Sequence, residues 1–142
     1  MKEAVLLFDG GSRGNPGPSG CGYVIMNSEE TKIITTGCKF IGVNTNNYAE
    51  YMGMIFGLQK ALELNISSLI VKGDSMLVIK QMLKQYSVKA PNLIPLYNYA
   101  NNFLNGFEDI KFYHIKRNLN TLADKLANQA MNNNKIESNI NI

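Results

Sequence analysis

The sequence is poor in the residues that build several common kinds of site. It has two cysteines, Cys21 and Cys38, and one histidine, His114. These do not form the paired spacing of a zinc site, which excludes that class. No apolar run approaches the ~20 residues of a membrane-spanning helix, and no basic segment with an apolar core marks a secretory signal. We therefore expect a cytoplasmic protein with free thiols and no membrane partner.

Arginine is also scarce. The chain has twelve lysines but only two arginines, Arg13 and Arg117. Its abundant Asn, Lys and Ile suggest an AT-rich coding bias, under which lysine is expected wherever either cation would serve. Arginine at these two positions therefore indicates that the guanidinium group matters there. The net charge of +3 permits nucleic-acid binding without requiring it.

The length and the apolar fraction fit a single soluble domain. The chain has 142 residues, 45% of them hydrophobic, which is enough for a core of its own. We assign residues 1–131 to the domain and expect the polar, aperiodic residues 132–142 to be a disordered tail.

Hydrophobic patterning predicts an α/β fold. Three strands precede the first helix, and strands then alternate with helices, which implies a five-stranded mixed sheet flanked by helices. The first three strands should be antiparallel and the rest parallel. The predicted strands cover residues 4–9, 23–27, 32–41, 69–72 and 109–115; the predicted helices cover residues 47–64, 75–85, a stretch after the loop bounded by Pro91 and Pro95 to about residue 104, and residues 121–131.

Four acidic residues occur where a predicted strand ends or a predicted helix begins: Asp9, Glu50, Asp74 and Asp124. The first strand and the one ending near residue 72 should lie side by side and parallel, which places Asp9 near Asp74. Carboxylates gathered at one sheet edge repel each other unless a cation neutralises them. The set therefore predicts a divalent metal site acting on a phosphate.

Each acid taken singly also has a local explanation. Asp74 could be a helix N-cap, and Asp9 could be a turn residue. Asn47 with Glu50, and Thr121 with Asp124, have the spacing of capping boxes. For Glu50, Asp74 and Asp124 alone the local explanation is the better one. Separate local roles do not, however, predict that the four acids converge.

Four segments resemble, in order, the signatures of type 1 ribonuclease H. They read FDGGSRGNPGPSG from Phe8, TNNYAEY from Thr45, GDS from Gly73 and NTLADKLA from Asn120, and the resemblance covers residues 4 to about 131. It implies a ribonuclease H-like fold and an endonuclease that cuts the RNA strand of RNA–DNA hybrids, leaving 5′-phosphate and 3′-hydroxyl ends. The implied cofactor is Mg²⁺, as two ions, with Mn²⁺ as an alternative, and the expected form is a monomer.

The resemblance also implies roles for individual residues. The four acids fall on the family's catalytic metal ligands. Gly10 to Asn15 fall on the loop that approaches the RNA strand, and Thr45 falls in a DNA-phosphate pocket. The expected substrate-binding residues are Gly10, Gly11, Ser12, Arg13, Gly14, Asn15, Thr45, Asn46, Asn47 and Ser75.

The sequence departs from well-known bacterial members of that family in three places. The basic insertion with extra lysines and tryptophans is missing, and residues 85–96 carry only Lys89 as a charge. His114 has the family's ten-residue separation from the last acid, but its strand-like surroundings indicate a structural role. Arg117, before Asp124, resembles a branch with arginine in place of the catalytic histidine. We therefore assign Arg117 an electrostatic catalytic role.

Two other functions remain open at this point. A nonenzymatic hybrid-binding module would keep the fold but usually loses one or more of the acids. A related nuclease or strand-transfer enzyme acting on DNA is disfavoured by the Gly-Asn-Pro-Gly and Thr-Asn-Asn motifs. Separately, a hairpin turning at residues 29 and 30 would place Cys21 opposite Cys38, close enough to crosslink after a small adjustment.

Overall fold

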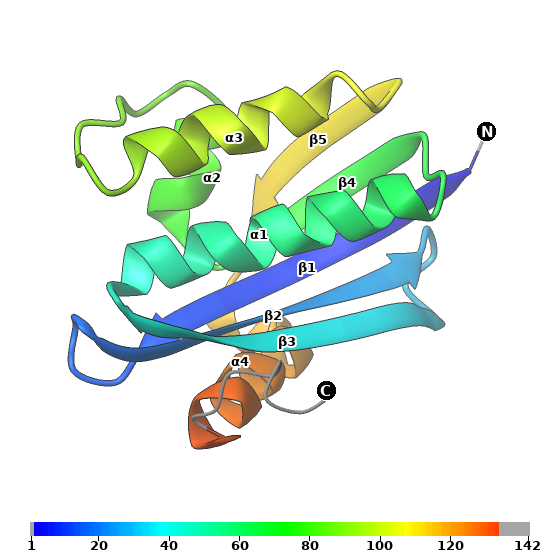
Figure 1. The fold of residues 1–142 in the computed structure, drawn as a ribbon. Helices are drawn as coiled ribbons and strands as arrows, with labels where there is room; N and C mark the ends of the chain where they lie inside the picture. The colour runs from blue at the N-terminus through cyan, green and yellow to red at the C-terminus, as the bar shows by residue number, and fades with distance from the viewer. Residues whose placement is uncertain (1, 134–142) are drawn as a thin grey trace.

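The computed structural model describes residues 2–133. Over this range the chain forms one five-stranded sheet, four α-helices and a single 3₁₀ turn (Figure 1). In chain order these are β1 (Glu3–Ser12), β2 (Gly17–Asn27), β3 (Ile33–Asn44), α1 (Asn46–Glu63), β4 (Ser68–Gly73), α2 (Met76–Met82), α3 (Ile94–Leu104), β5 (Asp109–His114), η1 (Arg117–Leu119) and α4 (Thr121–Asn133).

The sheet confirms the predicted topology. The strand order is β3-β2-β1-β4-β5. β2 pairs antiparallel with both β1 and β3, whereas β4 pairs parallel with β1 and β5. The carboxyl ends of β1, β4 and β5 therefore meet at one end of the sheet, the usual position for a ligand in such folds.

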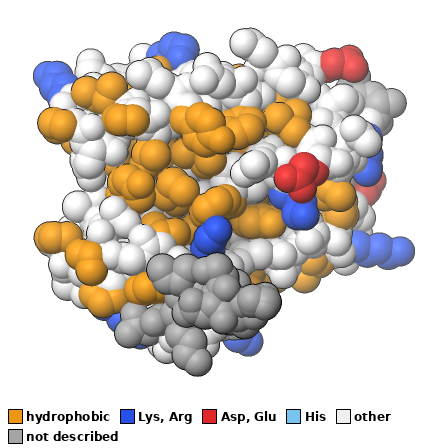
Figure 2. All heavy atoms as spheres, in the orientation of Figure 1, with side chains coloured by type: hydrophobic (Ala, Val, Ile, Leu, Met, Phe, Trp, Pro, Cys, Tyr) orange, Lys and Arg blue, Asp and Glu red, His pale blue; other side chains and the backbone are white. Residues whose placement is uncertain are grey.

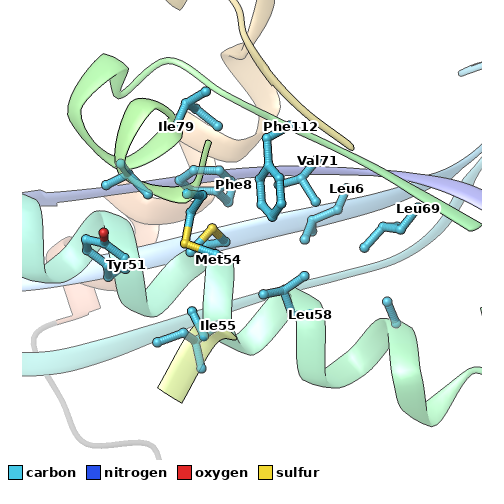
Figure 3. Packing of buried hydrophobic residues seen from close by; sticks show 14 of the residues in the cluster. Leu6, Phe8, Tyr51, Met54, Ile55, Leu58, Leu69, Val71, Ile79 and Phe112 are labelled. Carbon is cyan, nitrogen blue, oxygen red and sulfur yellow. The ribbon is translucent and has the colours of Figure 1, made fainter. Parts of the chain in front are cut away.

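The helices cover both faces of the sheet. α1, α2 and α3 lie on one face, and α4 packs against β1, β2 and β3 from the other (Figure 1). Figure 3 shows the larger core, in which Tyr51, Met54 and Leu58 of α1 lie against Leu6 and Phe8 of β1. A smaller core lies under α4. Burial of these side chains, at roughly 1.5–3 kcal/mol each, holds the layers together.

The face formed by α1 and α3 is largely apolar. Figure 2 shows hydrophobic side chains over its middle and only sparse acidic ones. Partly buried side chains such as Met52, Leu96 and Phe103 pack there against the core. The acidic residues of interest lie instead at the end of the sheet.

Residues 10–22, a glycine-rich segment that we expect from the sequence to be a loop between the first two strands, are mostly strand. Gly10 to Ser12 extend β1, Gly17 to Gly22 belong to β2, and the two stretches pair with each other. Only residues 13–16 form the turn. Glycine hides strand character in a sequence because it supplies no apolar side chain to the alternating pattern.

The predicted pairing of Cys21 with Cys38 is wrong. The hairpin turns as expected, since the Asn27 amide donates to Lys32 O. A bulge in β3 then shifts the register by one residue, so that Cys21 lies opposite Lys39. Cys21 is buried and Cys38 is exposed. A one-residue shift reverses the face on which a strand residue lies, so the two cysteines are not opposed in the register.

Some helix ends also differ from the prediction. α2 ends at Met82 rather than at residue 85, and Lys84 has a φ of 63°, a left-handed conformation that stops the helix. α4 continues through Asn133, two residues into the expected tail. The rest of that tail, residues 134–142, lies outside the described residues. None of the helices in residues 2–133 is long and apolar enough to span a membrane.

Candidate active site

Three of the four predicted acids meet at the carboxyl end of the sheet. Asp9 lies in β1, Asp74 directly follows β4, and Glu50 projects from α1. One carboxylate oxygen from each lies within 4.8 Å of the others. Side chains that are 41 and 24 residues apart along the chain thus form one anionic cluster.

Pairing and close packing bring these three acids together. Phe8 pairs with Gly73, so the next residues, Asp9 and Asp74, leave adjacent parallel strands side by side. Glu50 reaches them because α1 lies unusually close to β1. A Cβ on Gly10 would be 2.2 Å from the Ala49 backbone, and one on Gly53 would be 2.5 Å from Asp9 O. Only glycine permits this approach.

The structure assigns the local capping roles to neighbouring residues. Thr45 caps α1, accepting the Tyr48 amide at 3.2 Å, and Ser75 caps α2, accepting the Val78 amide at 3.3 Å. α4 begins at Thr121, so Thr121 lies inside the helix. Glu50, Asp74 and Asp124 are therefore not needed as caps, and the local explanations for their positions fail.

Burial dominates the electrostatics of the three acids. It raises the pKa of Asp9 to about 7, and the Asp74 charge adds to this increase. The pKa of Glu50 is raised well above its usual range, first by burial and then by Asp9 and Asp74. Burial also raises the pKa of Asp74, against the lowering effects of Asn120 and Arg117. The folded chain supplies too little positive charge for this cluster.

The cluster fits a divalent cation. Its donors are hard carboxylate oxygens, the type that Mg²⁺, Mn²⁺ and Ca²⁺ prefer. The Oε1 atom of Glu50 is buried and has no hydrogen-bond partner among the described residues. An unpaired buried oxygen is costly, and a cation would satisfy it while offsetting both the burial and the repulsion that raise the pKa of the three acids.

Asp124 lies on the other side of the site. It is not one of the three acids whose oxygens meet within 4.8 Å. Its Oδ1 is 3.7 Å from Nη2 of Arg117, and the two side chains are 33% and 81% exposed. Asn128, one turn along α4, donates to Asp124 O at 3.0 Å and to its Oδ1 at 3.4 Å. Asp124 is thus neutralised by the chain itself.

The acids line a cleft of about 460 Å³ that also contains both arginines of the chain. Asp9, Glu50, Asp74, Asp124 and Arg117, the predicted catalytic set, all face it. Of the predicted substrate-binding residues, Gly10, Gly11, Ser12, Arg13 and Asn46 line it, whereas Gly14, Asn15, Thr45, Asn47 and Ser75 do not.

Two of the residues that do not line the cleft, Asn15 and Thr45, hold neighbouring segments in place. The Asn15 side chain accepts the Asn46 amide at 3.0 Å, and Asn46 Oδ1 accepts the Ser12 amide at 2.7 Å. These bonds tie the turn after β1 to the start of α1. The oxygen of Thr45 is occupied by the Tyr48 amide and by Asn92, whose side chain donates at 3.2 Å.

Sequence reasoning gave no individual role to Asn120 or Asn128, although both contact the predicted acids. Asn120 is 1% exposed, and its amide donates to Phe8 O at 2.8 Å. The available signal was spacing: with Asp124, these residues recur every four positions, which places them on one side of a helix. Ala127 and Met131 continue that wall of the cleft.

The expectation that His114 lies in a strand is confirmed, since it is the last residue of β5. The side chain is exposed, so it adds little to core packing. It is not among the residues that line the cleft.

Comparison with known proteins agrees with this fold. The family described as "Reverse transcriptase-like" matches residues 7–130. The bifunctional protein Rv2228c of Mycobacterium tuberculosis is 42% identical over 129 residues, 91% of this chain and 35% of that protein. Ribonuclease HI of Halobacterium salinarum is 40% identical over 124 residues, 87% of this chain and 62% of that enzyme. The chain thus spans roughly a third to three fifths of these relatives.

Solved structures give the same result at the level of the domain. The N-terminal RNase H domain of Rv2228c superposes with a TM-score of 0.92 at 40% identity, covering 94% of this chain and 96% of that one. LC11-RNase H1, solved in complex with an RNA/DNA hybrid, has a TM-score of 0.87 at 32% identity, covering 92% and 97%. The chain belongs to the type 1 ribonuclease H family of enzymes.

Proposed function

We propose that this protein is an endonuclease that hydrolyses the RNA strand of RNA–DNA hybrids with two divalent metal ions, Mg²⁺ or Mn²⁺, leaving 5′-phosphate and 3′-hydroxyl ends. The observation that carries the proposal is the meeting of Asp9, Glu50 and Asp74 within 4.8 Å at the bottom of an open cleft. Its relatives include a named ribonuclease HI and an RNase H1 solved with a hybrid.

The buried acids would hold the cations. Bound divalent cations activate a water for attack on phosphorus and stabilise the departing oxygen. Asp9 and Glu50 offer oxygens from the buried side of the cleft, and Asp74 offers one from the end of β4. Asp124 would complete the set from α4 once its pairing with Arg117 loosens.

The rim of the cleft would bind and orient the substrate. The backbone of Gly10 and Gly11 lies open to the cleft and can approach a ribose, whose 2′-hydroxyl distinguishes RNA from DNA. Arg117 is largely exposed and can place a planar pair of donors against a phosphate. Because a guanidinium group keeps its proton in proteins, Arg117 would stabilise charge rather than transfer a proton.

The test is incubation with an end-labelled RNA–DNA hybrid and with the matched RNA and DNA duplexes, in Mg²⁺, Mn²⁺ or EDTA. We expect cleavage of the RNA strand of the hybrid only, dependent on the cation, with products that a 5′-phosphate-dependent exonuclease degrades. Binding of the hybrid without cleavage would identify a hybrid-binding module instead. Cleavage of the DNA duplex would identify a DNA nuclease.

A further inference from the structure

One buried side chain connects two of the segments that carry the acids, the end of β1 and the residue after β4. Asn120, between η1 and α4, is 1% exposed. Its Nδ2 donates to Phe8 O at 2.8 Å, one residue before Asp9, and lies 3.5 Å from Asp74 Oδ2. The backbone of Asn120 makes two further hydrogen bonds. Its backbone carbonyl accepts the Asp124 backbone amide at 3.1 Å, and its backbone amide donates to Arg117 O at 2.9 Å. No other described side chain makes hydrogen bonds to both β1 and the Asp74 carboxylate.

The orientation of the Asn120 amide follows from its partners. Phe8 O can only accept, so the amide nitrogen must face it. The Oδ1 atom is then left buried, with no hydrogen-bond partner among the described residues. Such an atom costs roughly 1–3 kcal/mol. A residue needed only for packing would be cheaper as an apolar side chain, so the site uses this asparagine for its donor.

We propose that Asn120 is a positioning residue whose side chain fixes the carboxylates of Asp9 and Asp74 relative to one another, so that they accept divalent cations in one geometry. This inference rests on the proposed function for its catalytic consequence, but not for its effect on cation binding. Aspartate is nearly isosteric with asparagine but could not replace it, because a carboxylate would face both Phe8 O and the Asp74 carboxylate without a proton to donate.

Gln81 is a matched control. It is another buried amide, 3% exposed, and it also ties separate elements together. Its Oε1 accepts from Tyr51 Oη at 2.6 Å, and its Nε2 donates to Ser87 O at 3.3 Å. It does not line the cleft. Gln81→Ala therefore removes a buried hydrogen-bonded amide at comparable structural cost without touching the acids.

The first measurement does not use activity. Metal-free wild type, Asn120→Ala and Gln81→Ala are titrated with Mn²⁺ by isothermal titration calorimetry at a temperature at which all three are folded. We expect Asn120→Ala to weaken Mn²⁺ binding by roughly 10- to 100-fold, the usual effect of removing a partner that orients metal ligands. Gln81→Ala should bind Mn²⁺ like wild type. Asn120→Leu, which keeps a similar volume but has no donor, replaces Asn120→Ala if that variant does not fold.

The second measurement separates an effect on kcat from an effect on KM. With the hybrid substrate, Asn120→Ala should lower kcat by a similar factor and leave KM unchanged, because the substrate-binding rim is intact. Wild-type Mn²⁺ affinity in the folded Asn120 variant, or equal weakening by Gln81→Ala, would overturn the inference. If wild type binds Mn²⁺ but does not cleave hybrid, the proposed function fails, and the Mn²⁺ affinities still decide the role of Asn120.

Discussion

On one side of the cleft, Asp9 and Glu50 are held against the sheet with raised pKa values and no cationic side chain among their hydrogen-bond or ion-pair partners in the described residues. On the other side, Asp124 is one-third exposed and pairs with Arg117. The same kind of side chain is thus left uncompensated in one place and neutralised by the chain in the other. Asp9 and Glu50 therefore need a bound cation to balance their charge, whereas Asp124 has Arg117 beside it.

This contrast assigns different work to the two sides. Charges in low dielectric interact strongly, so a cation bound among buried carboxylates is held firmly and has a large effect. An exposed arginine is weakly tied to its partner and free to move to a substrate phosphate, since exposed pairs are worth roughly 0–1 kcal/mol. Substitutions on the two sides should therefore differ in kind as well as in size.

The largest effect is expected on the buried side. Asp9→Asn should lower turnover by more than ~1000-fold, because loss of a cation that supplies several kcal/mol to the transition state removes several powers of ten. Glu50→Gln and Asp74→Asn should behave alike. Single-turnover cleavage of a labelled hybrid measures this. Turnover near that of wild type in Asp9→Asn would contradict the mechanism.

The next effect concerns the exposed side. Arg117→Ala should lower kcat by roughly 10- to 1000-fold, the range for removing one donor to the transition state, without weakening the affinity for Mn²⁺. Arg117→Lys should recover only part of the activity, because lysine cannot offer a planar pair of donors. Steady-state kinetics and calorimetry separate the two quantities.

His114→Ala is the control for Arg117. Its side chain is exposed nearby, so we expect little change in activity and a stability change within about 0.5 kcal/mol. If His114→Ala removes activity in a folded protein while Arg117→Ala does not, the histidine has the catalytic role and Arg117 does not.

The pH dependence of stability tests directly whether Asp9 lacks a neutralising cation in the folded protein. The pKa of Asp9 is raised from 3.8 to about 7 in the folded state. The contribution of Asp9 to the free energy of unfolding is fully present below pH 3.8, where Asp9 is protonated in both the folded and the unfolded state. It is lost as pH rises toward and through about 7, where Asp9 in the folded state must give up its proton.

In EDTA, wild type should therefore lose stability relative to Asp9→Asn over that pH range, by a few kcal/mol at ~1.4 kcal/mol per pKa unit. Saturating Mn²⁺ should remove the loss in wild type. Denaturant unfolding at pH 4.5, 6 and 8 measures it. A difference between the two proteins that does not change with pH would show that Asp9 is already compensated.

The smallest effect is expected outside the cleft. Lys80, Lys84 and Lys89 lie in and after α2, where they can reach a nucleic-acid backbone. Lys80 and Lys84 rest over Tyr86 and Tyr97. Replacing all three by alanine should lower hybrid affinity and reduce the salt slope by about 0.9 for each phosphate that these lysines neutralise in the wild type, with kcat unchanged.

Lys60 and Lys72 provide the control for the lysine substitutions. They pair with Glu63 and Glu30, so their replacement by alanine should leave the salt slope unchanged. An unchanged salt slope in the triple variant would remove α2 and the loop after it from the substrate-binding surface. Fluorescence anisotropy with a labelled hybrid at several salt concentrations, in EDTA, measures both sets.

Apolar runs and the order of motifs were sufficient to predict the sheet topology and to single out four acids that line one cleft. Strand direction follows from chain order and connection length, and parallel strands necessarily bring their carboxyl ends together. Asp9 and Asp74 could therefore be placed near each other from residue order alone. The two arginines were also identifiable, because a lysine-rich chain makes each arginine informative.

Only the tertiary structure decided which acids are buried together and what supports them. Asp124 pairs with Arg117 and also adds to the raised pKa of all three clustered acids, and Asn120 supports the cluster through Phe8 and Asp74. The bulge in β3 that moves Cys38 out of register with Cys21 could not be predicted from the sequence either. Residue order fixes which elements form, but burial, register shifts and hydrogen bonds between distant residues depend on how those elements pack, and packing is a property of the whole chain.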